Sequence, residues 1–222
     1  MDFTKLPEIF IRNIDNFSKG VRESLLLALY TVLFGTLLGI IVTLLRRTKI
    51  APIRWLMTLY VEFIRGTPLL VQALIFCYGV PSIGIKIERH TLAIISLIIN
   101  SSAYMSEIIR AGIDAIDRGQ TEAAFSLGMS KLQNMIYIVL PQAIKTTLPA
   151  MGNEFVVIIK ESSVLYAVGI YELTYQATKM AATNYRYLET MVVAALIYFV
   201  LTFVTSKLLG LLERRLKRND MQ

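Results

Sequence analysis

The chain contains a run of 22 residues, from Ser24 to Leu45, that carries no charged side chain: SLLLALYTVLFGTLLGIIVTLL. A helix needs roughly 20 predominantly apolar residues to cross the hydrocarbon core of a bilayer, so this run predicts a membrane-spanning helix. Four further apolar stretches predict four more spans: Ile53–Val80, Thr91–Ile109, Met135–Ile159 and Tyr187–Leu209. Only 18% of the residues are charged and 55% are hydrophobic, which leaves too little charge for the surface of a soluble domain. The chain is therefore predicted to be an all-α membrane protein with five transmembrane helices.

The positive charges of the loops predict how these spans are oriented. The loop between the first two spans carries Arg46, Arg47, Lys49 and Arg54 without a carboxylate, and the tail, residues 213–222, is also basic. Short basic segments remain on the cytoplasmic side of a membrane. Five spans then place the N-terminus outside and the C-terminus in the cytoplasm, with residues 112–134 in a cytoplasmic loop. The predicted parts are an interfacial segment (residues 1–20), a transmembrane region (residues 21–212) and the tail.

Several classes of function are disfavoured by the residue types. Cys77 is the only cysteine and His90 the only histidine, so neither a disulfide framework nor a metal site is expected. The net charge of +7 is divided between membrane flanks, which argues against a nucleic-acid partner. The spans contain no aspartate and no convergent catalytic set, and none has the full-length polar stripe of a passive channel. The segment before the first span is predicted to be an amphipathic interfacial helix, with an apolar face formed by Phe3, Leu6, Phe10, Ile14 and Phe17.

A short polar helix is predicted in the cytoplasmic loop. Thr121 is a favourable N-cap, Glu122 suits the positive end of the helix dipole, and Ala123 and Ala124 are strong helix formers. Gly128 supplies a left-handed stop, and an apolar side is formed by Phe125, Leu127 and Met129. A helix of two turns is marginal in water, so this one is expected to pack on a partner surface. The alternative is a surface loop that happens to be helical.

The spacing around this helix carries a more specific signal. Glu122-Ala123-Ala124 is followed by Gly128 and then by Ile138 and Leu140-Pro141. This pattern resembles the EAA signature of the permease subunits of ABC importers. Three segments resemble the subfamily that imports polar amino acids: Phe63–Gly79, Glu107–Ala124 and Gly152–Leu165. The resemblance covers residues 20–212.

The resemblance implies a multi-pass permease subunit in a prokaryotic inner membrane. Residues 119–134 would be a coupling helix that docks on a dimer of cytoplasmic ATPase subunits, through Thr121, Glu122, Ala123, Ala124, Gly128 and Met129. A second permease copy or a paralogue would complete the pathway, and an external binding protein would deliver the amino acid. The chain has no phosphate-binding loop of the form G-x-x-x-x-G-K-[ST], so no cofactor is expected here and ATP would be bound by the partner.

Polar groups within the spans are candidates for substrate binding, because they are costly in a membrane. Gly66, Thr67 and Pro68 interrupt the second span and free backbone groups; Asn100 and Ser101 lie in the third span, and Asn153 and Glu154 in the fourth. Glu154 is expected to bind the ammonium group or a cationic side chain, which favours basic amino acids; glutamine or glutamate is the alternative cargo.

Each of these candidates also has a structural interpretation. Gly66–Pro68 could be a packing kink, Asn100-Ser101-Ser102 could join helices, and Glu154 could pair with Arg65. Glu62, Glu107 and Arg110 are expected to form structural ion pairs near the cytoplasm. Gly35 and Gly39 predict a face of close helix packing inside the bundle.

Overall fold

The computed structural model describes residues 3–218, and within this range every regular element is helical. The longer helices are α1 (Leu6–Arg12), α2 (Ile14–Arg46), α3 (Ala51–Gly66), α6 (Arg89–Asp114), α7 (Arg118–Ser126), α9 (Leu140–Glu161), α10 (Leu173–Asn184) and α11 (Tyr187–Arg218). Shorter pieces are η1 (Phe3–Lys5), α4 (Leu69–Leu74), η2 (Ile75–Gly79), α5 (Val80–Ser82), α8 (Lys131–Gln133), η3 (Asn134–Val139) and η4 (Ser162–Val168). The all-α prediction is confirmed.

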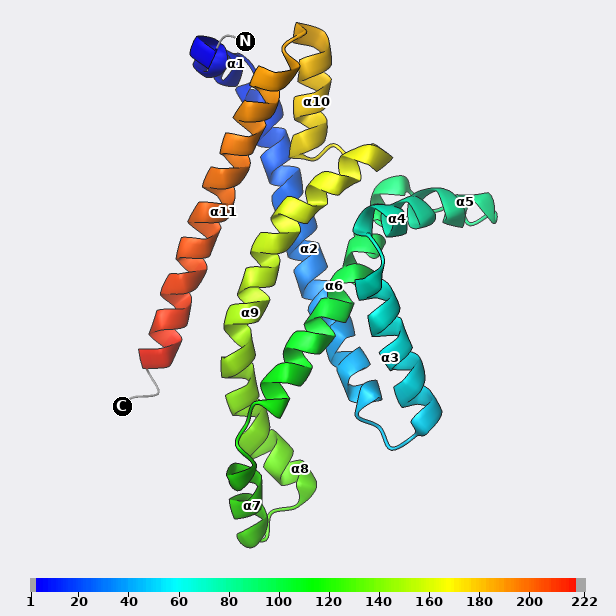
Figure 1. Ribbon diagram of the computed structural model, residues 1–222, viewed down its shortest axis with the longest axis vertical. Coiled ribbons are helices and arrows are strands. Elements are labelled where there is room, and N and C mark those ends of the chain that lie inside the picture. Colours follow the sequence, from blue (N-terminus) through cyan, green and yellow to red (C-terminus); the bar gives the residue numbers. More distant parts are fainter. Residues whose placement is uncertain (1–2, 219–222) are drawn as a thin grey trace.

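Helices α2 and α6 cross at the centre of the bundle, and α3, α9, α10 and α11 surround them (Figure 1). The crossing is close because α2 presents glycine at two positions. A Cβ on Gly39 would lie 2.7 Å from the Cβ of Met105, and a Cβ on Gly35 would lie 3.0 Å from that of Ser101. One turn further on, the Thr43 hydroxyl donates to the carbonyl oxygen of Ser106 at 3.1 Å. The predicted packing face is thus confirmed.

Three helices in the described range are long and apolar enough to cross a membrane: Ile14–Arg46, Arg89–Asp114 and Tyr187–Arg214. A fourth is obtained if α3 is counted together with Leu69–Ser82. These two helices meet at a bend of 105°, so the interruption predicted at Gly66–Pro68 within Ile53–Val80 is confirmed. The bend lies at Thr67 and Pro68, where proline has no backbone N–H to continue the ladder.

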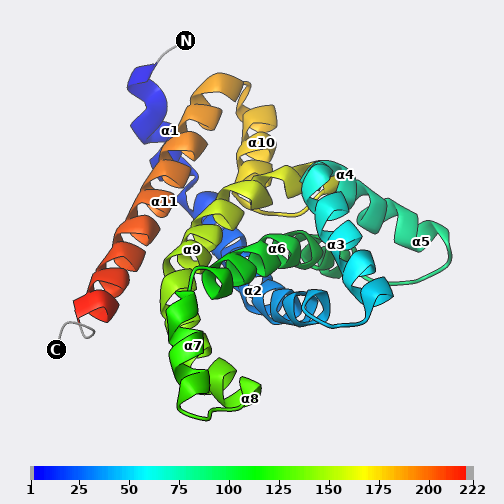
Figure 2. The same cartoon turned by 60° about the horizontal axis from the view of Figure 1, so that its bottom comes forward.

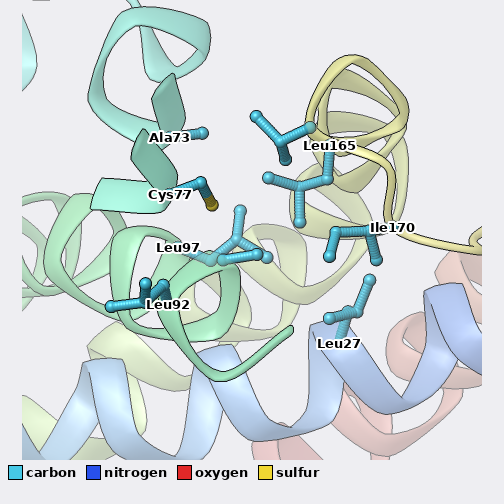
Figure 3. Close-up of a cluster of buried hydrophobic side chains, with 9 residues drawn as sticks. Leu27, Ala73, Cys77, Leu92, Leu97, Leu165 and Ile170 are labelled. Atoms are coloured by element: carbon cyan, nitrogen blue, oxygen red, sulfur yellow. The ribbon is translucent and has the colours of Figure 1, made fainter. Parts of the chain in front are cut away.

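The folded-back segment α4–α5 is held against the bundle by an apolar core. Ala73 and Cys77 face α6, and η4 packs over them from the other side (Figure 3). The core is formed by Leu27, Ala73, Cys77, Leu92, Ala93, Leu97, Leu165, Val168 and Ile170. Cys77 is therefore a small buried apolar residue here, and His90 lies in the first turn of α6, where it pairs with Glu23.

Helix α10 connects the last two long helices, in a stretch where the sequence predicted no helix. Glu172 caps it, because its carboxylate accepts from the backbone N–H groups of Thr174 and Tyr175 at 2.9 and 2.7 Å. The Tyr198 hydroxyl of α11 donates to the same carboxylate at 2.7 Å. Glu172 is fully buried. It therefore ties α10 to α11, at the end of the molecule that holds α1.

Candidate functional site

Helix α7 is the predicted polar helix, and with α8 it projects beyond the ends of α6 and α9 (Figures 1 and 2). Its N-cap is Asp117, whose carboxylate accepts from the backbone N–H of Gly119 at 2.6 Å. The prediction of Thr121 as the N-cap is wrong, because the helix begins three residues earlier, at Arg118. Thr121 instead lies inside the helix, where its hydroxyl accepts from the Asn134 side chain at 3.4 Å.

The other end of α7 is a Schellman motif, as the sequence indicated. Gly128 has φ of +79°, in the left-handed region. The backbone N–H of Gly128 donates to the carbonyl of Phe125 at 2.9 Å, and that of Met129 donates to the carbonyl of Ala124 at 3.1 Å. The Ser130 hydroxyl then caps the next helix by accepting from the backbone N–H of Gln133. The turn between α7 and α8 is therefore fully specified by local bonds.

Helix α7 exposes apolar side chains that nothing in the described part of the chain covers. Ala124 is its one buried residue, whereas Leu127 is 84% exposed and Phe125 is 43% exposed. Leu132 on α8 is 69% exposed beside them. Glu122 and Ala123 also lie on the surface. A projecting helix with this apolar surface fits the expectation of a partner.

The break between α3 and α4 is bridged by Gln72, which the sequence analysis did not single out. Its amide nitrogen donates to the carbonyl oxygens of Ile64 and Thr67, at 2.8 and 3.2 Å, and to the Thr67 hydroxyl at 2.8 Å. The Ile64 carbonyl, which loses its helical donor because Pro68 has no N–H, thus obtains one from a side chain, and so does the Thr67 carbonyl at the break. The sequence could have identified Gln72, because it is a lone amide in an apolar stretch, one turn after Pro68.

The same amide connects the break to α6. The Asn100 side-chain nitrogen donates to the Gln72 carbonyl oxygen at 3.1 Å. The next residue, Ser101, donates its hydroxyl to the Glu154 carboxylate of α9 at 3.4 Å. Gln72, Asn100, Ser101 and Glu154 are all buried, with at most 8% of their surface exposed. Three separate segments of the chain therefore place buried polar side chains in two contacts, Gln72 with Asn100 and Ser101 with Glu154, which start from neighbouring residues of α6.

Glu154 has no cation beside it among residues 3–218. Arg65, its expected partner in the structural interpretation, instead lies 3.9 Å from Glu107 and over the ring of Tyr104. That pairing is wrong, whereas the predicted pair of Glu107 and Arg110 is confirmed, with a separation of 2.6 Å. Arg46 contacts Glu107 as well. Arg46, Arg65 and Arg110 thus all lie beside the carboxylate of Glu107 and not beside that of Glu154.

Other candidate positions lie at the edge of this set. Asn153 is exposed and does not bond to Gln72, Asn100, Ser101 or Glu154, and Gly66 and Pro68 are exposed at the bend. Ser102 serves helix packing, because its hydroxyl bonds to that of Tyr60 at 2.7 Å. Ser102 is thus the residue of this trio that joins α6 to α3. Asn100 contacts Gln72 at the break, and Ser101 contacts Glu154.

The comparison with protein families decides what kind of molecule this is. Residues 35–218 match the family described as the inner membrane component of binding-protein-dependent transport systems. The chain belongs to this family of transport permeases. A member of the family is a transport component and not itself catalytic, and it resides in the inner membrane of bacteria.

Curated relatives of this permease cover almost its whole length. The arginine transport system permease protein ArtQ of Bacillus subtilis is 38% identical over 203 residues, which are 91% of this chain and 93% of the relative. The probable glutamine ABC transporter permease protein GlnM of the same organism is also 38% identical, over 208 residues, with 92% and 96% covered. The L-cystine transport system permease protein TcyB, again from B. subtilis, is 36% identical, with 90% and 86% covered.

Solved structures agree with the fold of this permease. A crystal structure of an amino acid ABC transporter with histidines has a chain that is 45% identical, with a TM-score of 0.91 and coverage of 97% of this chain and 99% of that one. An inward-facing structure of the MetNI methionine ABC transporter is 18% identical with a TM-score of 0.75, covering 91% and 97%, and supports the fold alone.

Proposed function

We propose that this permease forms the translocation pathway of an ATP-driven importer for polar amino acids, with basic amino acids as the preferred cargo. Two copies, or this chain and a paralogue, enclose the pathway. Their α7 helices dock on a dimer of cytoplasmic ATPase subunits that binds the ATP, and a binding protein outside the membrane delivers the amino acid. The chain crosses the membrane five times, with the N-terminus outside, the C-terminus inside and α1 on the outer surface.

The importer class rests on the family and on the shape of α7. Relatives whose names specify arginine, glutamine and cystine transport match nearly the full chain. The Schellman turn at Gly128 and the exposed Phe125 and Leu127 present a firm apolar surface to a groove on another protein. Docking there lets closure of the ATPase dimer act on the helices that α7 joins.

The preference for a cationic cargo rests on one observation, the unpaired Glu154. A carboxylate that is 92% removed from solvent, with only a 3.4 Å contact from the Ser101 hydroxyl, lacks the compensation that buried charges require. An ammonium or guanidinium group of the cargo supplies it. The amides of Asn100 and Gln72, together with Thr67 at the bend, then lie where they contact the other end of the amino acid.

Substitution of Glu154 by glutamine tests this assignment, because it keeps the shape and removes the charge. In proteoliposomes with the ATPase and the binding protein, we expect the apparent affinity for arginine to fall roughly tenfold to a hundredfold. The control is Glu62→Gln, which changes an exposed glutamate on α3 and should leave transport normal. Unchanged arginine uptake by the Glu154→Gln variant would show that the carboxylate has a structural role. Equal losses for arginine and glutamine would assign Glu154 to the α-ammonium group common to both.

The five-span topology is tested by cysteine labelling after Cys77 is replaced by alanine. A cysteine at Ser82, the exposed last residue of α5, should react with a membrane-impermeant maleimide from outside intact cells. A cysteine at Lys49, exposed between α2 and α3, should react only after permeabilisation. The reverse pattern would invert the orientation of the whole chain without affecting the assignment of Glu154.

A further inference from the structure

An apolar groove of about 830 Å³ lies between α1, the first turns of α2 and the neighbouring part of α11. This volume falls within the ~300–1,000 Å³ of typical ligand sites. Twelve of its fourteen lining residues are apolar: Leu6, Pro7, Phe10, Ile14, Phe17, Val21, Leu25, Val193, Leu196, Ile197, Val200 and Leu201. The other two are Ser18 and Arg22, which follow one another by one turn on α2.

The walls of this groove are firmly supported. Phe10 of α1 stacks on Phe17 of α2 with 6.2 Å between ring centroids, and Phe17 is itself buried. Leu25 and Leu201 pack on the buried Ile158 and Ile159 of α9 and so form the floor. Because both walls and floor belong to packed clusters, the groove is part of the folded structure and its shape does not depend on a ligand.

The groove continues into the outward surface of α11, which stands apart from the central helices (Figure 1). Leu196 and Val200 line the groove and are still 53% and 57% exposed. Only 11% of the most apolar window of α11 is buried within the protein. In a membrane this surface meets hydrocarbon, so a lipid chain can enter the groove from the side without crossing a polar barrier.

Arg22 is the one charged residue that lines the groove. It is exposed, and within residues 3–218 it forms no ion pair. Lys19, one turn earlier on α2, is exposed as well and adds positive charge to this end. A guanidinium group above an apolar groove complements a phosphate group attached to acyl chains, because its planar donors bind phosphate oxygens in pairs.

We propose that this groove binds an acyl chain of one phospholipid, with the lipid's phosphate held by Arg22. In the topology proposed above, the lipid belongs to the outer leaflet; the site does not depend on which solute is transported. A second protein chain fits less well, because covering the groove with apolar side chains would bury the Arg22 guanidinium without an anion. Bound here, the lipid joins α1 to α11.

The test uses the full-length permease, assembled with its ATPase in nanodiscs that contain a phospholipid with a photoreactive acyl chain. Cross-links should concentrate in residues 18–25 and 193–201 of the chain. Native mass spectrometry of the same complex, after detergent extraction, should show one retained phospholipid per permease chain. Parallel samples with phosphatidylglycerol and phosphatidylethanolamine identify the preferred headgroup, since Asp15, exposed two turns before Arg22, favours an ammonium group.

Two matched pairs of variants separate the site from general lipid contact. Arg22→Gln should reduce lipid retention roughly tenfold, whereas Arg54→Gln, at another exposed arginine, should not. Leu196→Trp should fill the groove and remove its cross-links, whereas Leu29→Trp, at an equally exposed leucine (53%) on α2, should leave them intact. Equal effects within either pair, cross-links spread evenly over α11, or cross-links from these residues to a second permease chain would overturn the proposal.

Discussion

Replacing Gln72 by leucine tests whether a single side chain holds the bend between α3 and α4. Leucine has a similar volume and suits the apolar surroundings, so the change removes hydrogen bonds with little loss of packing. The carbonyl of Thr67 and the side-chain nitrogen of Asn100 lose a partner completely. The carbonyl of Ile64 keeps only a 3.5 Å contact from the Thr67 hydroxyl.

The expected magnitude follows from these three groups. A buried polar group left without a partner costs about 1–3 kcal/mol. Thr67 is only half-buried and Ile64 retains a weak donor, so the sum is smaller than three full penalties. We expect a loss of about 2–4 kcal/mol in the free energy of unfolding, which for a chain of this size lowers Tm by roughly 4–16 °C.

The measurement is thermal unfolding of the purified permease in mild detergent, followed by size-exclusion chromatography of the soluble fraction. Gln120→Leu, at an exposed glutamine on α7, is the control and should melt like the wild type. A double-mutant cycle with Asn100→Leu should give a coupling of about 0.5 kcal/mol or more, because the two amides are bonded. A Tm shift of Gln72→Leu below about 2 °C, or additive effects in the cycle, would show that Gln72 does not hold the bend.

Three further predictions concern helix packing, the α10 cap and coupling. Gly39→Ala should destabilise the bundle by about 1–3 kcal/mol in thermal unfolding, because its Cβ would lie 2.7 Å from that of Met105; Gly210→Ala, which meets nothing within 4 Å, should be neutral. Burial raises the pKa of Glu172, which lies outside the spans, so its contribution to stability is greatest below the unfolded pKa of about 4.3 and is lost as pH rises through the higher folded value. The Tm of the wild type relative to Glu172→Gln should therefore fall as pH increases, and a constant difference would contradict this. Gly128→Leu should strain the left-handed turn by roughly 1 kcal/mol and uncouple transport from ATP hydrolysis, while the variant still inserts; normal substrate-stimulated hydrolysis would remove α7 from the coupling step.

The sequence predicted the long helices well, because hydrophobic length and glycine geometry are local properties. Ser24–Leu45 lies within α2, and the pair Gly35 and Gly39 predicted a close packing face, whose partner the structure identifies as α6. The end of α7 at Gly128 was equally predictable from local sequence, since the turn requires a left-handed backbone conformation that glycine readily adopts. What failed was the choice between two nearby caps: Asp117 and Thr121 both suit an N-cap, and the bond from Gly119 decides between them.

Long-range geometry was harder to obtain from the sequence. Pro68 indicated where the second span breaks. The 105° bend, however, depends on the apolar core that surrounds Ala73 and Cys77, and distant segments of the chain build that core. Glu172 looked like any loop carboxylate, because its partner Tyr198 lies 26 residues further along the chain. Asn100, Ser101 and Glu154 were singled out as polar residues within spans, whereas the link from Asn100 to Gln72 required the bend to be known.

The connections of α7 show how the coupling proposed above would act on Glu154. Helix α7 follows α6 after a three-residue link and leads through α8 and η3 into α9. Ser101 lies 13 residues before the end of α6, and Glu154 lies 14 residues after the start of α9, so each is roughly 20 Å from the end of its helix that leads to α7. A displacement of α7 therefore acts on both helices that carry the contact between Ser101 and Glu154. That contact is long, at 3.4 Å, and within the described residues neither side chain has a second hydrogen-bond partner. A small relative shift of α6 and α9 would therefore change the surroundings of the carboxylate that we propose to bind the cargo. The bend at Gln72 is different, since its side-chain amide bonds to four polar atoms, three at the bend itself and one on Asn100 of α6.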